Sequence, residues 1–228
     1  MMCLQKYGAL ALGNKVAIAA LLICAATGAA RAETVTVLAF GDSLTQGYGL
    51  PDGDGFVPSL QAWLDDQGRE VTVINGGVSG DTTAGGLSRV DWSLEPQVDA
   101  MILTLGGNDM LRGLPPEMTR ENLDGILEIA EGKGVEVLLV GLQAPGNYGP
   151  DYKAEFDAIF PDLANEHETL YAPSFFAGIL PDGGTPEQAA GMMQADGIHP
   201  NAEGVDLIVE ALGPSVLELV DAVDAGSD

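Results

Sequence analysis

Cysteine is nearly absent from this sequence. Among its 228 residues only Cys3 and Cys24 carry thiols, and both lie within the first 32 residues. We expect that segment to be removed, so the remaining chain would contain no cysteine. This excludes disulfides and thiolate metal sites. We therefore expect residues 33–228 to form a single domain that is stabilised by its hydrophobic core alone.

The first 32 residues have the pattern of an export signal. Lys6 and Lys15 precede an apolar stretch from Val16 to Ala30, and Ala30-Arg31-Ala32 fits the small-x-small rule for cleavage after Ala32. The apolar stretch is shorter than the roughly 20 residues that span a bilayer, which disfavours the alternative of an uncleaved anchor. Ile23 occupies the position before Cys24 where lipid modification requires a small residue. We expect a periplasmic or secreted protein without a stable membrane anchor.

Positively charged residues are scarce. The chain has 9 lysines and arginines against 34 aspartates and glutamates, a formal net charge of −25. Loss of the leader removes three more positive charges and no negative ones. Such a charge excludes nucleic acid and anionic membrane surfaces as partners. A cationic substrate and a hydrated surface suited to saline surroundings remain alternatives, and the scattering of the acids along the chain favours the second.

Histidine and tryptophan are also rare, with two of each. The chain has no histidine or cysteine cluster for a metal, and Asp52-Gly53-Asp54-Gly55 lacks the ligand spacing of a calcium loop. We expect no metal and no cofactor.

His167 lies in a polar helix end, and we expect it to be solvated and without a catalytic role. Trp63 and Trp92 lie away from the motifs described below, which argues against sugar stacking.

Apolar, β-branched runs alternate with amphipathic stretches, a pattern that predicts a parallel sheet with helical crossovers. The expected fold is α/β, a three-layer α/β/α sandwich around a five-stranded parallel sheet. The predicted strands are Thr34–Phe40, Val71–Asn75, Ala100–Leu105, Val135–Gly141 and Thr169–Ala172. The predicted helices are Gly55–Gln67, Thr82–Val90, Thr119–Lys133, Asp151–His167 and Ala202–Val223.

A nucleophile and its base are predicted at the two ends of this domain. Ser43 follows the first strand in Phe40-Gly41-Asp42-Ser43-Leu44-Thr45, where the glycine is expected to permit a sharp turn. His199 has Asp196 three residues before it and Pro200 directly after it. This spacing permits the Asp196 carboxylate to meet Nδ1 and leaves Nε2 free for Ser43. The simpler alternatives are that Ser43 caps a helix and that His199 is a turn residue.

Two more glycine-rich strand exits supply candidate oxyanion donors. Gly80 follows the second strand and Asn108 the third, and the backbone N–H of Ser43 is a further candidate. Gly80 and Gly77 could instead be required only for positive φ, and Asn108 for a turn. The acids beside the catalytic positions, Asp42 and Asp109, are expected to be structural and to bind nearby backbone N–H groups.

Taken together, these four blocks resemble the SGNH (GDSL) hydrolase family, in the family's order. GDSLT carries Ser43, SGDTT carries Gly80, GGND carries Asn108, and DGIHP carries Asp196 and His199. Further similarity in Gly106–Pro116 and Gln143–Gly149 points to the bacterial periplasmic branch of thioesterases, lysophospholipases and arylesterases.

This resemblance implies a flavodoxin-like fold and a serine esterase that hydrolyses acyl esters or thioesters through an acyl-enzyme on Ser43. The expected partner is a small-molecule acyl ester or thioester, and we expect a monomer. A carbohydrate O-acetylesterase is the alternative enzyme, and an acyl- or lipid-binding protein is the alternative without catalysis. In the family two loops border an acyl groove, and the corresponding substrate-binding candidates here are Met110, Leu111, Leu114, Pro145, Asn147 and Tyr148.

Overall fold

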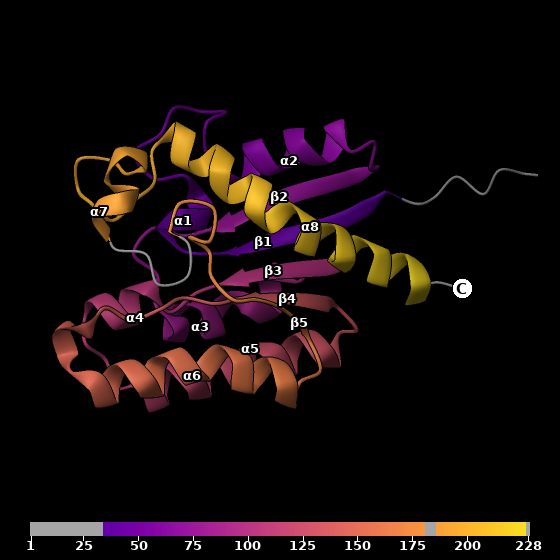
Figure 1. Cartoon of the computed structure of the whole chain (residues 1–228). Helices are drawn as coiled ribbons and strands as arrows, with labels where there is room; N and C mark the ends of the chain where they lie inside the picture. The colour runs from indigo at the N-terminus through magenta and orange to yellow at the C-terminus, as the bar shows by residue number, and fades with distance from the viewer. Residues whose placement is uncertain (1–33, 181–185, 227–228) are drawn as a thin grey trace, which may run out of the picture. The chain divides into compact units, whose positions relative to one another are not determined.

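The computed structural model describes residues 34–180 and 186–226, and its centre is one parallel sheet. The strand order is β2-β1-β3-β4-β5, and every neighbouring pair is parallel (Figure 1). The predicted five-stranded parallel sheet is therefore confirmed, and each strand lies within one or two residues of its prediction. The strands are β1 Val35–Gly41, β2 Val71–Gly77, β3 Ala100–Thr104, β4 Glu136–Val140 and β5 Leu170–Ala172.

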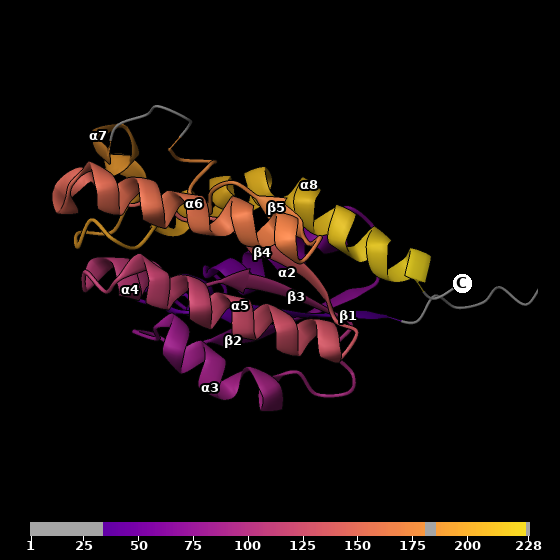
Figure 2. The same ribbon diagram turned by 90° about the horizontal axis from the view of Figure 1, so that it is seen from below.

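Helices cover both faces of the sheet, which confirms the three layers. Helices α2 and α8 pack together on one face, and α3, α5 and α6 cover the other (Figures 1 and 2). The long helices are α2 Phe56–Asp66, α3 Thr83–Ser93, α5 Pro116–Gly132, α6 Pro150–Glu166 and α8 Ala202–Gly226. The prediction started α5 three residues too late, because Pro115 and Pro116 were not recognised as a helix start, although proline at the first helical position is common.

Several short helices were not predicted. They are α1 Ser43–Gln46, α4 Gly107–Leu111 and α7 Pro186–Ala189, with the 3₁₀ turns η1 Gly146–Tyr148 and η2 Ala190–Met192. A helix of one turn is too short to show an apolar period, so the sequence pattern did not reveal them.

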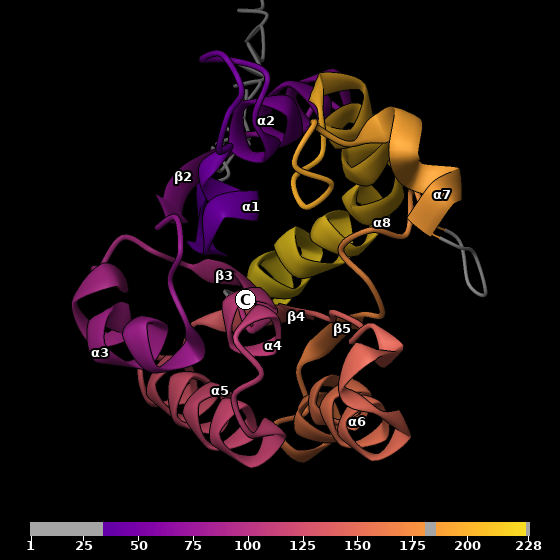
Figure 3. The same ribbon diagram turned by 90° about the vertical axis from the view of Figure 1, so that its left-hand side faces the viewer.

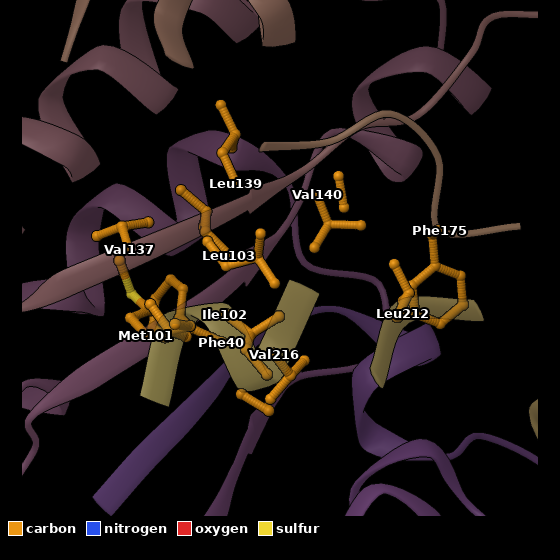
Figure 4. Packing of buried hydrophobic residues seen from close by; sticks show 14 of the residues in the cluster. Phe40, Met101, Ile102, Leu103, Val137, Leu139, Val140, Phe175, Leu212 and Val216 are labelled. Carbon is orange, nitrogen blue, oxygen red and sulfur yellow. The ribbon is translucent and has the colours of Figure 1, made fainter. Parts of the chain in front are cut away.

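The core lies between the sheet and its helices. All five residues of β3 are buried, as expected for a central strand covered on both faces. Figure 4 shows Ile102 and Val140 of the sheet close to Val216 and Leu212 of α8. Phe40 faces the other side, where the guanidinium of Arg89 in α3 lies 3.8 Å from the centre of its ring. This continuous apolar packing can stabilise a domain that has no cysteine between residues 34 and 226.

The strand order reverses between β1 and β3, which pair side by side although β2 lies between them in the sequence. In open α/β sheets, ligands bind at the carboxyl ends of the strands where the order reverses. Ser43 follows β1 and Asn108 follows β3, so both lie at this position. Figure 3 looks onto this edge, with α1, α4 and the segment before α8 around it.

Within the described ranges 34–180 and 186–226, no helix is long and apolar enough to cross a bilayer. The same ranges contain no group of three or more side chains that could hold a metal ion. The predicted signal over residues 1–32 lies outside the described residues and stays a prediction.

Candidate active site

Ser43 is the first residue of α1, directly beyond the end of β1. The cap of this helix is Asp42, whose Oδ1 accepts the N–H of Leu44 at 3.0 Å, so the alternative in which Ser43 itself is the cap is wrong. Gly41 does not have the positive φ of a sharp glycine turn. It is required for close approach instead, because a Cβ there would lie 2.1 Å from Thr45 Oγ1 and 2.7 Å from the carbonyl oxygen of Thr104.

Ser43, His199 and Asp196 form a continuous hydrogen-bonded chain. Nε2 of His199 lies 2.8 Å from Ser43 Oγ, and Nδ1 lies 2.7 Å from Asp196 Oδ2. The other carboxylate oxygen, Oδ1, accepts the N–H groups of Ile198 and His199 at 2.9 and 3.0 Å. The bond from His199, with help from these two N–H groups, lowers the pKa of Asp196 to about 2. An ionised Asp196 requires the proton on Nδ1, which leaves the Nε2 lone pair facing the serine hydroxyl.

The loop that carries His199 is held by contacts that the sequence analysis missed. The ring of Tyr48 lies 4.7 Å from that of His199, centroid to centroid. Gln194 Nε2 donates to the carbonyls of Tyr48 and Pro200 at 2.8 and 2.9 Å, and its backbone N–H donates to the carbonyl of His199. These bonds end on backbone carbonyls, which every residue type provides, so no sequence motif signals them.

Asn108 and Gly80 line the same cavity as Ser43 and His199. The Asn108 amide donates one hydrogen to Asp42 Oδ2 at 3.1 Å, which leaves its second hydrogen available. Asp42 is buried, and burial raises its pKa to about 6 against the opposing effects of the Leu44 N–H, Asn108 and His199. Among the described residues the backbone N–H groups of Ser43 and Gly80 have no acceptor.

The structure shows that glycine is required at positions 77 and 80 for two different reasons, which the sequence did not distinguish. Gly80 has φ of +79°, whereas Gly77 does not have a positive φ. Gly77 is needed because a Cβ would lie 2.3 Å from the backbone nitrogen of Gln46 in α1. Of these two positions, Gly80 requires glycine for its positive φ, and Gly77 requires glycine for close packing against α1.

Buried Arg89 forms hydrogen bonds with the C-terminal ends of both β1 and β2. Arg89 donates to the carbonyls of Gly76 and Gly41 at 2.9 and 2.8 Å and pairs with Asp81 at 2.7 Å. Asp109, predicted to be structural, accepts the N–H and hydroxyl of Thr83 at 2.9 and 2.6 Å. Arg89 was not predicted from the sequence, because two of its three partners are backbone carbonyls, which no residue type signals.

An apolar cavity of about 520 Å³ opens beside Ser43. Of the predicted substrate-binding residues, Met110 and Leu111 line it. Leu114, Pro145, Asn147 and Tyr148 are not among its lining residues, so this part of the prediction was wrong; the hydroxyl of Tyr148 donates to the carbonyl of Leu111 at 3.2 Å. The other large apolar side chains of the lining were not predicted, and they are Tyr48, Leu142, Phe176, Ile179, Leu180, Met193 and Ile198.

His167 differs from its prediction. Its side chain is only 12% exposed, and Nε2 lies 2.7 Å from Asp124 Oδ1. The prediction of a solvated histidine was wrong, because α5 supplies a partner from 43 residues away in the sequence. His167 is at the C-terminal end of α6 and does not line the cavity.

Comparisons with known proteins agree with this geometry. The GDSL-like lipase/acylhydrolase family matches residues 39–207. The chain is 38% identical to Esterase TesA of Pseudomonas aeruginosa, over 83% of this chain and 92% of that protein. It is 33% identical to an arylesterase of Vibrio mimicus, over 87% and 95%. It is 35% identical to Thioesterase 1/protease 1/lysophospholipase L1 of Escherichia coli, over 84% and 87%.

Solved structures give the same result. The crystal structure of TesA has a TM-score of 0.73 at 39% identity, covering 81% of this chain and 99% of that one. The psychrotrophic esterase EstA from Pseudoalteromonas has a TM-score of 0.74 at 29% identity, covering 82% and 98%. By motif order, fold and sequence similarity, this chain is a member of the GDSL-like lipase/acylhydrolase family and an ester hydrolase.

Proposed function

We propose that the enzyme hydrolyses acyl esters or thioesters in two steps, with Ser43 as nucleophile, His199 as general base and Asp196 as the residue that orients the base. The observation that supports this most is the hydrogen-bonded chain from Ser43 Oγ through His199 to Asp196, at 2.8 and 2.7 Å. A serine hydroxyl is a weak nucleophile unless a base removes its proton, and this chain provides that base.

In the first step Nε2 of His199 takes the hydroxyl proton as Ser43 Oγ bonds to the acyl carbon. The tetrahedral intermediate then collapses, and the leaving alcohol, phenol or thiol receives the proton from His199. In the second step His199 deprotonates water, which attacks the acyl-enzyme. The proton returns to Ser43 Oγ as the carboxylic acid departs. Asp196 stays ionised throughout, in keeping with its lowered pKa.

The oxyanion is proposed to be held by the N–H groups of Ser43 and Gly80 and by the side-chain amide of Asn108. Two observations support this: both backbone N–H groups have no acceptor in the described part of the chain, and one Asn108 hydrogen remains unused. Uncharged donors that are already oriented stabilise developing negative charge without reorganising during the reaction.

The substrate is proposed to carry a medium-length aliphatic acyl chain. The cavity beside Ser43 is lined mainly by Leu, Ile, Met and Phe side chains, and its size of about 520 Å³ suits an acyl chain. A polysaccharide is a poorer fit, because Trp63 packs against Gly213 of α8 and Trp92 lies on α3, away from the cavity lining.

The test is a substrate panel applied to the purified enzyme and to Ser43→Ala. The panel contains p-nitrophenyl esters of increasing chain length, acyl-CoA, a lysophospholipid and acetylated xylan. We expect a maximum at medium chains and activity at background in Ser43→Ala, with the melting temperature unchanged. The matched control is Ser88→Ala, which removes an exposed hydroxyl that binds only the carbonyl of Gly85. Activity of Ser43→Ala within about tenfold of wild type would sink the assignment.

We further propose that the enzyme is exported, that its leader is removed after Ala32, and that it acts as a monomer. The charge and spacing of the first 32 residues support the export, and the relatives named above support the ester substrate. The N-terminus of secreted or periplasmic material should be Glu33. Recovery of cytoplasmic protein that starts at Met1 would contradict this localisation.

A further inference from the structure

Arg112 differs from the other cations in the described part of the chain. Five of the six lysines and arginines there lie within 4.0 Å of a carboxylate: Arg69, Arg89, Arg120, Lys133 and Lys153. Among the described residues Arg112 has no such partner, although the chain carries 34 acidic residues. Its Nη2 donates to the carbonyl of Gly80 at 2.7 Å instead. The guanidinium is therefore directed at a backbone carbonyl in the site rather than at one of the many acids.

The same residue contacts both proposed oxyanion loops. The backbone N–H of Arg112 donates to the carbonyl of Asn108 at 3.1 Å at the end of α4, while its side chain holds Gly80. One residue thus connects the loop after β2 with the helix after β3. In the described residues, no other side chain donates to the backbone of Gly80.

Gly80 lies in a tight turn, and Arg112 holds one of the peptides of that turn. This glycine occupies the third position of a turn that is closed by the N–H of Asp81 on the carbonyl of Val78 at 3.0 Å. Its φ of +79° is the value of a type II turn. Glycine also accepts the negative φ of a type I turn, in which the central peptide is flipped and the Gly80 N–H points the other way. The Arg112 bond falls on the next peptide, which keeps its place in both turn types, so it holds the position of the turn beside α4 and does not set the direction of the central peptide.

We propose that Arg112 is a positioning residue of the oxyanion hole, which fixes Gly80 relative to Asn108. The inference rests on the proposed function, since it takes Gly80 and Asn108 as oxyanion donors. Arg112 acts through these donors and does not contact the substrate. Its effect therefore belongs to the transition state, where the oxyanion forms, and not to binding of the ground state.

The experiment compares Arg112→Gln and Arg112→Lys with the wild type and with Arg120→Gln. The control removes the same charge from an exposed arginine that pairs with Glu166 on α6. For Arg112→Gln we expect kcat to fall about tenfold on every ester, with KM little changed, as for the loss of one charged hydrogen bond. Affinity for an alkyl boronic acid, which forms a tetrahedral adduct on serine, should fall by the same factor. Arg112→Lys, which keeps the charge and a donor, should recover part of the loss.

A double-mutant cycle with Asn108→Ala tests the coupling. Asn108→Ala alone should lower kcat by roughly 10²–10³, and the further effect of Arg112→Gln should then be smaller than in the wild type. Additive losses, or unchanged kcat and boronate affinity in Arg112→Gln, would overturn the proposal. A rise in KM confined to anionic substrates would also overturn it and identify Arg112 as a binding residue. If Ser43→Ala and Asn108→Ala retained activity, the proposed function itself would fail.

Discussion

At the scale of single residues, Asp42 joins the nucleophile to the oxyanion side of the site. One of its oxygens caps α1 through the N–H of Leu44, and the other holds the side-chain amide of Asn108. A change at this buried carboxyl therefore affects Ser43 and Asn108 together. Asp42 was predicted to be structural. Its hydrogen bond with Asn108 shows that this structural role includes orienting a side chain of the site.

The pKa of Asp42 gives a prediction about stability. Burial raises it from 3.8 to about 6, so the folded protein binds this proton more tightly than the unfolded chain. The resulting stabilisation is fully present below about pH 4 and is lost as the pH rises through about 6; it amounts to at most about 3 kcal/mol. In Asp42→Asn we expect this fall in stability to be absent.

The measurement is the free energy of unfolding in urea between pH 4 and pH 8. Asp66→Asn, at an exposed position on α2, serves as the matched control, because it makes the same substitution at the surface. The informative quantity is the difference in slope between the two variants. Equal slopes would show that Asp42 has the same pKa in the folded and unfolded states.

At the scale of elements, the site depends on how closely α1 lies against β2. Gly77 ends β2, and a Cβ there would lie 2.3 Å from the nitrogen and 2.7 Å from the Cα of Gln46. Both atoms belong to the backbone of α1, so no side-chain rotation relieves the clash. We predict that Gly77→Ala shifts α1, destabilises the protein by about 1–3 kcal/mol and lowers kcat, because Ser43 is on the displaced helix.

Gly132→Ala is the comparison for this prediction. No atom lies within 4 Å of the Cβ position at Gly132, which is at the end of α5, so stability and kcat should stay near wild type. Thermal unfolding and ester kinetics on both variants check this. Wild-type stability in Gly77→Ala would mean that α1 is not confined by β2.

At the scale of the whole molecule, negative charge dominates. Residues 33–228 carry a formal net charge of −28, since loss of the leader takes three positive charges from the chain's −25. Five of the six cations there each pair with one carboxylate, and the surplus acids repel one another over the surface. The screening length falls from roughly 8 Å at 0.15 M to roughly 3 Å at 1 M ionic strength. We predict that the melting temperature of residues 33–228 rises as NaCl increases to molar concentration.

Sucrose is the uncharged control, since it stabilises folded proteins through exclusion and not through screening. A melting temperature that is flat or falls in NaCl would show that self-repulsion is not the main effect. That result would favour the alternative in which the carboxylates serve a cationic partner.

The sequence by itself determined the sheet and the order of the motifs. The strands were predictable because a parallel sheet covered on both faces needs nearly continuous apolar runs, such as that of β3. The sequence also predicted that three residues come together: Ser43, Asn108 and His199. Each lies in a short motif at a strand end or before a helix, and the strand ends meet at one edge of the sheet. The same local patterns correctly led to the family of the chain.

Only the tertiary structure decided what surrounds these residues. The cavity lining, the contact of His167 with Asp124, and the hydrogen bonds of Arg89, Gln194 and Arg112 all join segments that are distant in sequence. Most of these bonds end on backbone carbonyls, which are the same for every residue type. The sequence therefore shows which side chains can donate a hydrogen bond, but the accepting carbonyl is determined only by the folded structure.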